Sequence, residues 1–312
     1  MTSTESATHF LVIGAGELGM AMIRSLTAHI TGNALPDTVT VLLRPSTGEL
    51  AADKTRQLEE LHAAGVAIVH AEVATASTAE LAEIFGRYDT VISCLGFAAG
   101  AGTQRKLTEA ALAARVSRYL PWQFGVDYDV VGRGSPQNLF DEQLDVRDLL
   151  RGQHDTHWII VSTGMFTSFL FEPAFGVVNI EANTVHALGS WDNTVTLTTP
   201  EDIGRLTTEV LYAQPPFVDE VVYLAGDTIT YRQLADIVDA TLDTRVRRVE
   251  WTVEHLHTEL ADDPTDTMRK YRAVFAEGVG VAWPLERTFN HTNGLAATTA
   301  GRWARAHLTV SA

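Results

Sequence analysis

The stretch "HFLVIGAGELGMAMIRSL" (residues 9–26) joins an apolar run to a G-x-G-x-x-G pattern and then to apolar residues at helical spacing. A strand, a glycine loop and a helix in this order are typical of a dinucleotide-binding fold. Gly14 permits the tight turn, Gly16 lets a pyrophosphate approach the backbone, and Gly19 permits close packing of the helix. A glycine turn without a ligand is the alternative. The predicted contacts in the loop are Gly14, Gly16, Glu17, Leu18 and Gly19.

Short β-rich runs alternate with helical patterns through the first half of the chain. The predicted strands are 9–13, 38–43, 66–70, 89–96, 117–121 and 156–164, and the predicted helices are 20–30, 49–65, 78–88, 103–116 and 138–153. This alternation predicts an α/β fold, a Rossmann-type doubly wound parallel sheet. Beyond about residue 170 the rhythm breaks into a smaller mixed α/β region. We therefore expect a nucleotide-binding domain over 1–165, completed by parts of 190–226, and a substrate-binding region over 166–312.

The end of the second predicted strand indicates which cofactor binds. An acid there would bond the ribose 2′-hydroxyl of NAD, but "TVLLRPST" places Arg44 in that position with no acid beside it in the sequence. A guanidinium suits a 2′-phosphate, and Lys54 adds a second cation at the start of the next helix. The pair favours NADP(H) over NAD(H), with ordinary surface residues as the alternative.

Composition excludes several classes of function. The chain has 23 Lys and Arg residues and 39 Asp and Glu residues, so its net charge is 23 − 39 = −16. This negative charge disfavours nucleic acid as a partner. Cys94 is the single cysteine, so no internal disulfide forms and a reducing compartment fits best. We see no leader sequence in residues 1–9, no membrane-length apolar run and no metal-ligand spacing. These observations predict a cytoplasmic protein, a monomer or homodimer, without membrane, nucleic-acid or metal partners.

Several segments resemble one family. "VLLRPST", "DTVISCLG", "TQRKLTEAALAARVSRYLPWQFGVDYD", "VRDLL" and "WIIVSTGMFTSFLF" look like the NmrA-like, isoflavone reductase-like group of atypical short-chain dehydrogenases. That group includes phenylcoumaran benzylic ether, pinoresinol–lariciresinol and isoflavone reductases. The resemblance runs from about residue 9 to the C-terminus and is weak after residue 230. It implies an NADP(H)-binding fold and a small aromatic or hydrophobic substrate.

The resemblance also implies further site residues. "RYLPWQFG" is similar to the family segment that lies beside the nicotinamide. For Cys94 and Met165, simple packing is an interpretation at least as good as a direct role in the site. The additional cofactor contacts implied are Cys94, Leu95, Gly96, Gln104, Gln123, Phe124 and Gln143. The implied substrate contacts are Trp122, Phe124, Met165, Phe166 and Tyr271.

Catalysis presents a difficulty. The family reductases carry a lysine general acid/base in a pattern like F-E-x-K-x-x-V-R, but "FDEQLDVR" places Gln143 there, and an amide exchanges no proton near neutral pH. No lysine follows a tyrosine by four positions, so Tyr-x-x-x-Lys chemistry is also excluded.

Three hypotheses stay open. In the first, a reductase reduces a quinone, enone or similar acceptor whose product water can protonate, and Gln143 orients the substrate oxygen. In the second, a relocated acid acts, with candidates Tyr128 and its neighbours Asp127 and Asp129, or Lys270 and Tyr271. In the third, the chain is a non-catalytic NADP(H)-binding redox sensor of the NmrA type. The aromatic residues Trp122, Phe124 and Phe166 favour an NADPH-dependent reductase of a small aromatic or conjugated metabolite.

Overall fold

The computed structural model describes residues 7–46 and 51–308. Its chain divides into two units, each described here by itself. Unit 1 consists of Met1–Gln123, Asp145–Ile160 and Ile203–Val221, and unit 2 consists of Phe124–Leu144, Val161–Asp202 and Val222–Ala312.

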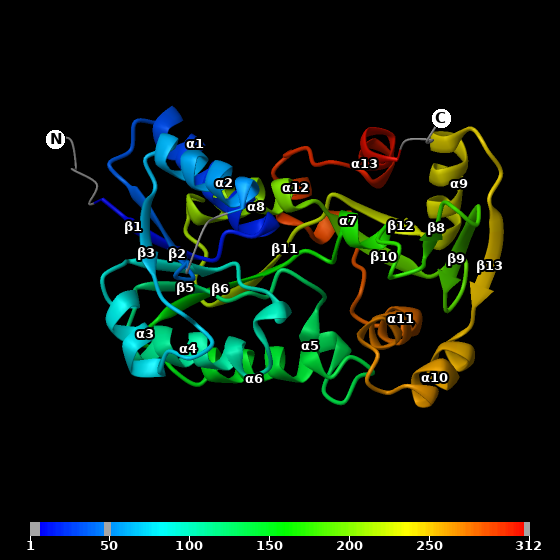
Figure 1. The fold of residues 1–312 in the computed structure, drawn as a ribbon, viewed down its shortest axis with the longest axis horizontal. Coiled ribbons are helices and arrows are strands. Elements are labelled where there is room, and N and C mark those ends of the chain that lie inside the picture. The colour runs from blue at the N-terminus through cyan, green and yellow to red at the C-terminus, as the bar shows by residue number, and fades with distance from the viewer. Residues whose placement is uncertain (1–6, 47–50, 309–312) are drawn as a thin grey trace. The chain divides into compact units, whose positions relative to one another are not determined.

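In the described part of the chain, seven strands form the sheet on which unit 1 is built (Figure 1). Their order is β11-β6-β5-β4-β1-β2-β3, so the direction in which successive strands are added to the sheet reverses between β1 and β4. The strands are β1 (His9–Ile13), β2 (Thr38–Leu43), β3 (Ala67–His70), β4 (Thr90–Ser93), β5 (Arg118–Leu120), β6 (His157–Ser162) and β11 (Glu220–Tyr223). The pairs from β3 across to β6 are all parallel. The doubly wound parallel sheet predicted from the sequence is therefore confirmed.

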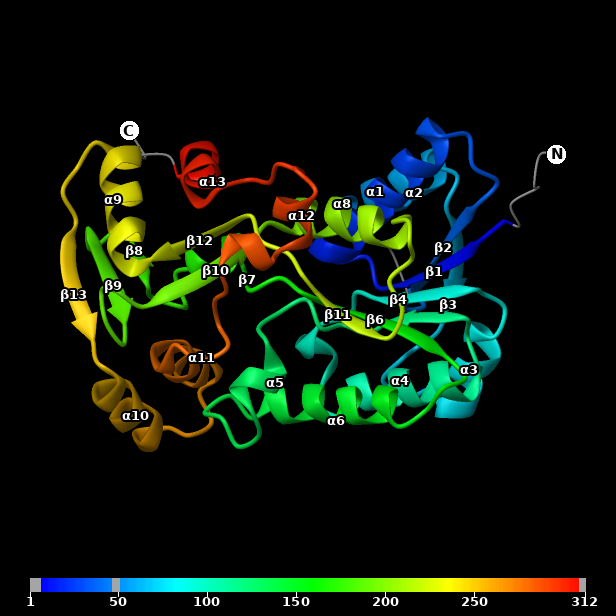
Figure 2. The same ribbon diagram turned by 180° about the vertical axis from the view of Figure 1, so that it is seen from behind.

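Helices cover both faces of this sheet (Figures 1 and 2). On one face lie α1 (Glu17–Gly32), α2 (Ala52–Ala63) and α8 (Pro200–Leu211). On the other lie α3 (Thr78–Phe85), α4 (Thr103–Ala113) and the second half of α6 (Leu139–Arg151). Leu11, Val91 and Ile160 are fully buried against this second group of helices. Burial on both faces explains why the strands read as continuous apolar runs in the sequence.

Unit 2 is built on two smaller sheets. One has the order β12-β10-β7 and the other β13-β9-β8 in the described residues. Their strands are β7 (Met165–Phe166), β8 (Val178–Asn179), β9 (Thr184–Leu188), β10 (Thr194–Thr198), β12 (Asp227–Thr230) and β13 (Arg247–Trp251). The accompanying helices are α5 (Tyr128–Val131), α7 (Thr167–Leu170), α9 (Tyr231–Leu242), α10 (Val253–Asp262), α11 (Thr267–Glu277), α12 (Phe289–Thr292) and α13 (Ala300–His307).

Local signals placed most element boundaries within a few residues. The helix predicted from residue 20 begins earlier, at Glu17, because Gly16 is its N-cap. Thr230 caps α9 in a reciprocal capping box with Gln233. Residues 1–6 of the N-terminal stretch and residues 49–50 of the helix predicted over 49–65 lie outside the described residues. We expected parts of 190–226 to complete the nucleotide-binding domain, and β11, which lies in that range, joins the large sheet. Its four residues carry no signal for β6 as the partner strand.

Helices α1 and α8 of unit 1 meet at a glycine. A Cβ on Gly204 would lie 2.6 Å from the backbone carbon and oxygen of Ala21. Gly204→Ala therefore forces the two helices apart, and we expect it to destabilise the protein by about 1–3 kcal/mol in urea unfolding. Gly32→Ala, at the end of α1 with nothing within 4 Å of the new Cβ, is the matched control. Equal stability of the two variants would contradict this packing.

Candidate functional site

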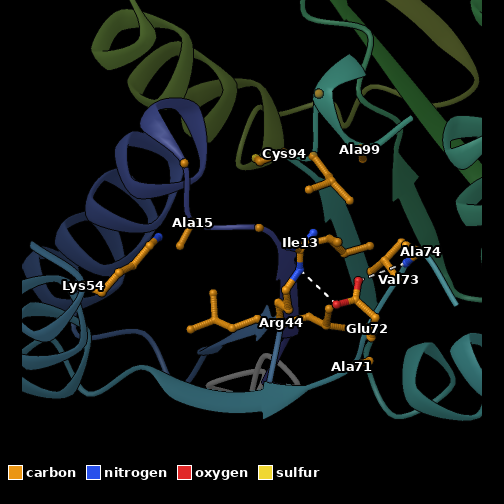
Figure 3. A pocket seen from close by; sticks show the side chains of 16 residues that line it. Ile13, Ala15, Arg44, Lys54, Ala71, Glu72, Val73, Ala74, Cys94 and Ala99 are labelled. Atoms are coloured by element: carbon orange, nitrogen blue, oxygen red, sulfur yellow. Dashed lines mark hydrogen bonds and ion pairs between the residues drawn. The ribbon is translucent and has the colours of Figure 1, made fainter. Parts of the chain in front are cut away.

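A pocket of about 440 Å³ lies in unit 1 where strands β1, β2, β3 and β4 end (Figure 3). It is lined by Ile13, Gly14, Ala15, Gly16, Leu42, Leu43, Arg44, Lys54, Ala71, Glu72, Val73, Ala74, Cys94, Leu95, Gly96 and Ala99. The carboxyl ends of parallel strands, at the point where strand order reverses, are where open α/β sheets bind ligands. Seven of the predicted cofactor contacts therefore share one pocket: Gly14, Gly16, Arg44, Lys54, Cys94, Leu95 and Gly96.

The glycine loop has the shape that a pyrophosphate requires. Gly14 has φ +90°, a value that residues with a side chain rarely adopt. A Cβ on Gly19 would lie 2.1 Å from the Gly14 oxygen, so this glycine lets α1 begin directly above the loop. A Cβ on Gly16 would meet open space, so the backbone there can be approached closely. Because α1 has 16 residues and a glycine N-cap, the positive end of its dipole would favour an anion bound at the loop.

The other two loop residues lie differently. Glu17 opens α1 at an exposed position, and Leu18 is buried in the core. Neither lines the pocket as described. A cofactor contact from either would come through its backbone, and this stays a prediction.

Two cations and one carboxylate carry the charge of the pocket. Arg44 Nε lies 3.0 Å from Glu72 Oε2, and Lys54 Nζ donates to Gln57 Oε1 at 2.9 Å. In Figure 3, Arg44 reaches toward Glu72, while Lys54 approaches from the other side of the pocket. Gln57 Nε2 also donates to the carbonyl oxygen of Ala15, so it links Lys54 to the glycine loop.

Sequence reasoning missed both Glu72 and Gln57. Glu72 is 28 residues from Arg44 in the chain, yet Leu43 and His70 are register partners in the parallel pair β2 and β3. Residues that follow the two strands therefore reach the same edge of the sheet, and this register was the signal that could have revealed Glu72. Gln57, one helical turn after Lys54, carries no motif.

The loop after β4 is held in place by residues on both sides. Gln104 is buried and its Nε2 donates to the Leu95 oxygen at 2.8 Å, so it positions that loop without lining the pocket. Trp122 packs on Gly96, where a Cβ would lie 3.2 Å from Trp122 Cζ2. The Trp122 ring also meets Phe97 edge to face at 4.6 Å.

Cys94 and Gln123 belong to the interior of unit 1. Burial raises the pKa of the Cys94 thiol well above its usual range, so the sulfur stays protonated at neutral pH. Gln123 is fully buried, and its Oε1 accepts from Arg147 Nε at 2.7 Å. Arg147 is itself fully buried, so Gln123 provides an acceptor for one N–H of a guanidinium in the core.

The remaining predicted residues belong to unit 2. Tyr128 is buried, and a row of edge-to-face contacts runs from Tyr128 to Phe140 (5.0 Å) and from Phe140 to Tyr271 (6.1 Å). Burial raises the pKa of the Tyr271 hydroxyl, which disfavours its ionised form. Lys270 Nζ donates to Asn138 Oδ1 at 2.7 Å. Tyr128 on α5, and Lys270 and Tyr271 on α11, thus contact residues at the start of α6, namely Asn138 and Phe140.

Four further side chains of unit 2 were expected at the site. Phe124 and Met165 are buried, and Phe166 is half-buried on β7. Gln143 lies on α6 with its side chain fully buried. Their roles toward cofactor or substrate stay predictions.

Two further features of residues 7–46 and 51–308 bear on the class of site. These residues contain no group of three or more His, Cys, Asp or Glu side chains placed to hold a metal ion. They also contain no helix with the length and apolarity that crossing a membrane requires.

Known proteins resemble this chain over most of its length. The model of the NmrA-like family matches residues 7–292. An NmrA-like family domain-containing oxidoreductase of Gibberella moniliformis is 45% identical over 293 residues, which are 93% of this chain and 95% of the relative. The crystal structure of an isoflavone reductase superimposes with a TM-score of 0.78 at 14% identity, covering 97% of this chain and 100% of that one. The structure of AtPrR2 with NADP+ and (+)pinoresinol has a TM-score of 0.75 at 16% identity, with the same coverage.

The raised pKa and the burial of Cys94, which lines the pocket, can be tested by the reactivity of its thiol. We expect the folded protein to react with Ellman's reagent at pH 8 at least about 100-fold more slowly than the protein unfolded in guanidinium, because little thiolate is present and the sulfur is covered. Absorbance at 412 nm measures the released thiolate of the reagent. Rapid labelling of the folded chain would show that Cys94 is open to solvent and ionised.

Proposed function

This chain belongs to the NmrA-like family, and we propose that it is an NADPH-dependent reductase that transfers hydride to a small aromatic or conjugated metabolite. The family resemblance inferred from the sequence is confirmed. The observation that carries the proposal is the unit 1 pocket, where the glycine loop, the start of α1 and two cations converge. The name of the Gibberella relative supports the oxidoreductase class.

NADP(H) fits the residues of this pocket. The pyrophosphate would lie against the loop 14–19 and the first turn of α1, and the 2′-phosphate against Arg44 and Lys54. When bound, the cofactor supplies the hydride. AtPrR2, which shares the fold, was solved with NADP+, and this supports the assignment.

The substrate class rests on the missing proton donor. Gln143 holds an oxygen by hydrogen bonds but transfers no proton near neutral pH. Hydride addition to a quinone, quinone methide or enone gives a stabilised anion that water protonates, so such acceptors need no lysine. We place the substrate-binding site in residues 166–312, together with the substrate contacts that the family resemblance implies. The (+)pinoresinol in AtPrR2 supports an aromatic substrate. The proposal includes a cytoplasmic location, because a single cysteine fits a reducing compartment. It also includes a monomeric or homodimeric state.

Gln143 also favours a second candidate, an NADP(H)-binding sensor that regulates partners and does not turn over. The two candidates separate in a panel assay of NADPH oxidation with quinones, enones, aryl ethers and aryl aldehydes. Turnover of any acceptor supports the reductase. Absence of turnover, together with a protein partner that binds only with one redox form of the cofactor, supports the sensor.

Arg44 gives the first prediction about the cofactor. We expect NADPH to bind more tightly than NADH, and Arg44→Ala to raise the NADPH Kd about ten-fold while changing the NADH Kd less than about two-fold, because only NADPH carries the 2′-phosphate. Isothermal titration calorimetry measures both constants. Arg24→Ala, which removes an arginine of α1 that pairs with Glu60 outside the pocket, is the control. Equal affinity of the wild type for the two cofactors would refute the assignment.

The missing lysine gives a prediction about pH. If no side chain donates the proton, kcat for a quinone acceptor stays constant between about pH 6 and pH 8, because no group with a pKa in that range takes part in the reaction. Steady-state rates at saturating NADPH measure this profile. A fall in kcat with a midpoint inside that range, abolished in Lys270→Met or Tyr128→Phe, would instead assign the donor to that residue.

A further inference from the structure

The ion pair between Arg44 and Glu72 lies inside the pocket proposed for the cofactor. Both residues line it, and Arg44 Nε is 3.0 Å from Glu72 Oε2. The Arg44 side chain is 75% exposed and that of Glu72 is 35% exposed. The guanidinium is therefore accessible to a ligand, but it is already directed to a carboxylate (Figure 3).

The backbone fixes this encounter. Leu43 and His70 are paired in register at the ends of β2 and β3, so Arg44 and Glu72 follow from neighbouring strands. The Glu72 carboxylate also accepts from the backbone amide of Ala74 at 3.3 Å, which holds it over the turn after β3. The pairing of β2 with β3 therefore places Glu72 in the pocket wall.

The charges that line the pocket show how the Arg44–Glu72 pair affects a bound cofactor. Arg44, Lys54 and Glu72 are the lining residues of the described pocket that are charged at neutral pH, so one of two positive charges is balanced by Glu72. Lys54, in contrast, donates to the neutral amide of Gln57. A 2′-phosphate must draw Arg44 away from Glu72 or share it, and the carboxylate also repels the phosphate. The ribose 2′-hydroxyl of NADH meets neither cost.

We propose that Glu72 is a specificity-determining residue, which lowers the preference of the pocket for a 2′-phosphorylated cofactor over its unphosphorylated form by pairing with Arg44. The inference rests on the proposed function, because it concerns the same pocket. It assigns the degree of cofactor preference to a residue outside the glycine loop and outside the end of β2.

The test is Glu72→Gln, which keeps the size and the hydrogen-bonding oxygen but removes the charge. We expect its NADPH Kd to fall about five-fold and its NADH Kd to change less than about two-fold, as for a partly exposed charge in a solvated pocket. The gain shrinks when NaCl is raised from 0.05 M to 0.5 M, because salt screens the charge. Glu60→Gln, which breaks the Arg24–Glu60 pair outside the pocket, leaves both constants unchanged.

A second variant tests the role of the pair. In an Arg44→Ala background, Glu72→Gln should lose the part of its effect on the NADPH Kd that comes from releasing the guanidinium, and should keep only the smaller gain from removing the direct repulsion between the carboxylate and the phosphate. An undiminished gain in that background would overturn the pairing mechanism. If the wild type binds neither cofactor, the proposed function fails. If it binds NADPH and Glu72→Gln changes no constant, the proposed function stands and this inference fails.

Discussion

The passage of helix α1 over the Gly14 carbonyl is the constraint on which the cofactor pocket depends. No side chain fits at Gly19, where a Cβ would lie 2.1 Å from the Gly14 oxygen. Because the helix begins that close to the loop, its dipole and first-turn amides face the space between the strand ends. The loop after β4, held by Gln104 and Trp122, lines the same space. The pocket follows from backbone packing before any charged residue contributes.

The sequence predicted what depends on local pattern. Buried apolar strands such as "HFLVI" and the amphipathic helices between them are local signals, and the doubly wound sheet follows from their alternation. The position of Glu72 beside Arg44 depends on strand register, and the place of β11 in the large sheet depends on contacts far along the chain. Neither leaves a mark in a short window of sequence. The smaller mixed α/β region was predicted, but the pairing of its strands was not, since β7 and β8 have two residues each.

Cofactor recognition and chemistry rest on different parts of the chain. The unit 1 pocket gathers residue types that suit a phosphorylated cofactor, whereas the candidates for catalysis, Gln143, Tyr128 and Lys270, lie in unit 2. Gln143 is fully buried, Tyr128 packs on Phe140, and Lys270 is engaged by Asn138. In the proposed function, a family fold with a nucleotide pocket and a glutamine at the family's lysine position therefore fits acceptors that need hydride but no protein acid.

A crystal structure of the chain grown with NADP+ tests the central claim most directly. We expect the pyrophosphate against residues 14–19 and the adenosine 2′-phosphate within hydrogen-bond distance, below about 3.2 Å, of the Arg44 guanidinium, with Glu72 displaced from it. NADP+ bound elsewhere, or a 2′-phosphate directed into solvent while Arg44 stays paired with Glu72, would contradict it.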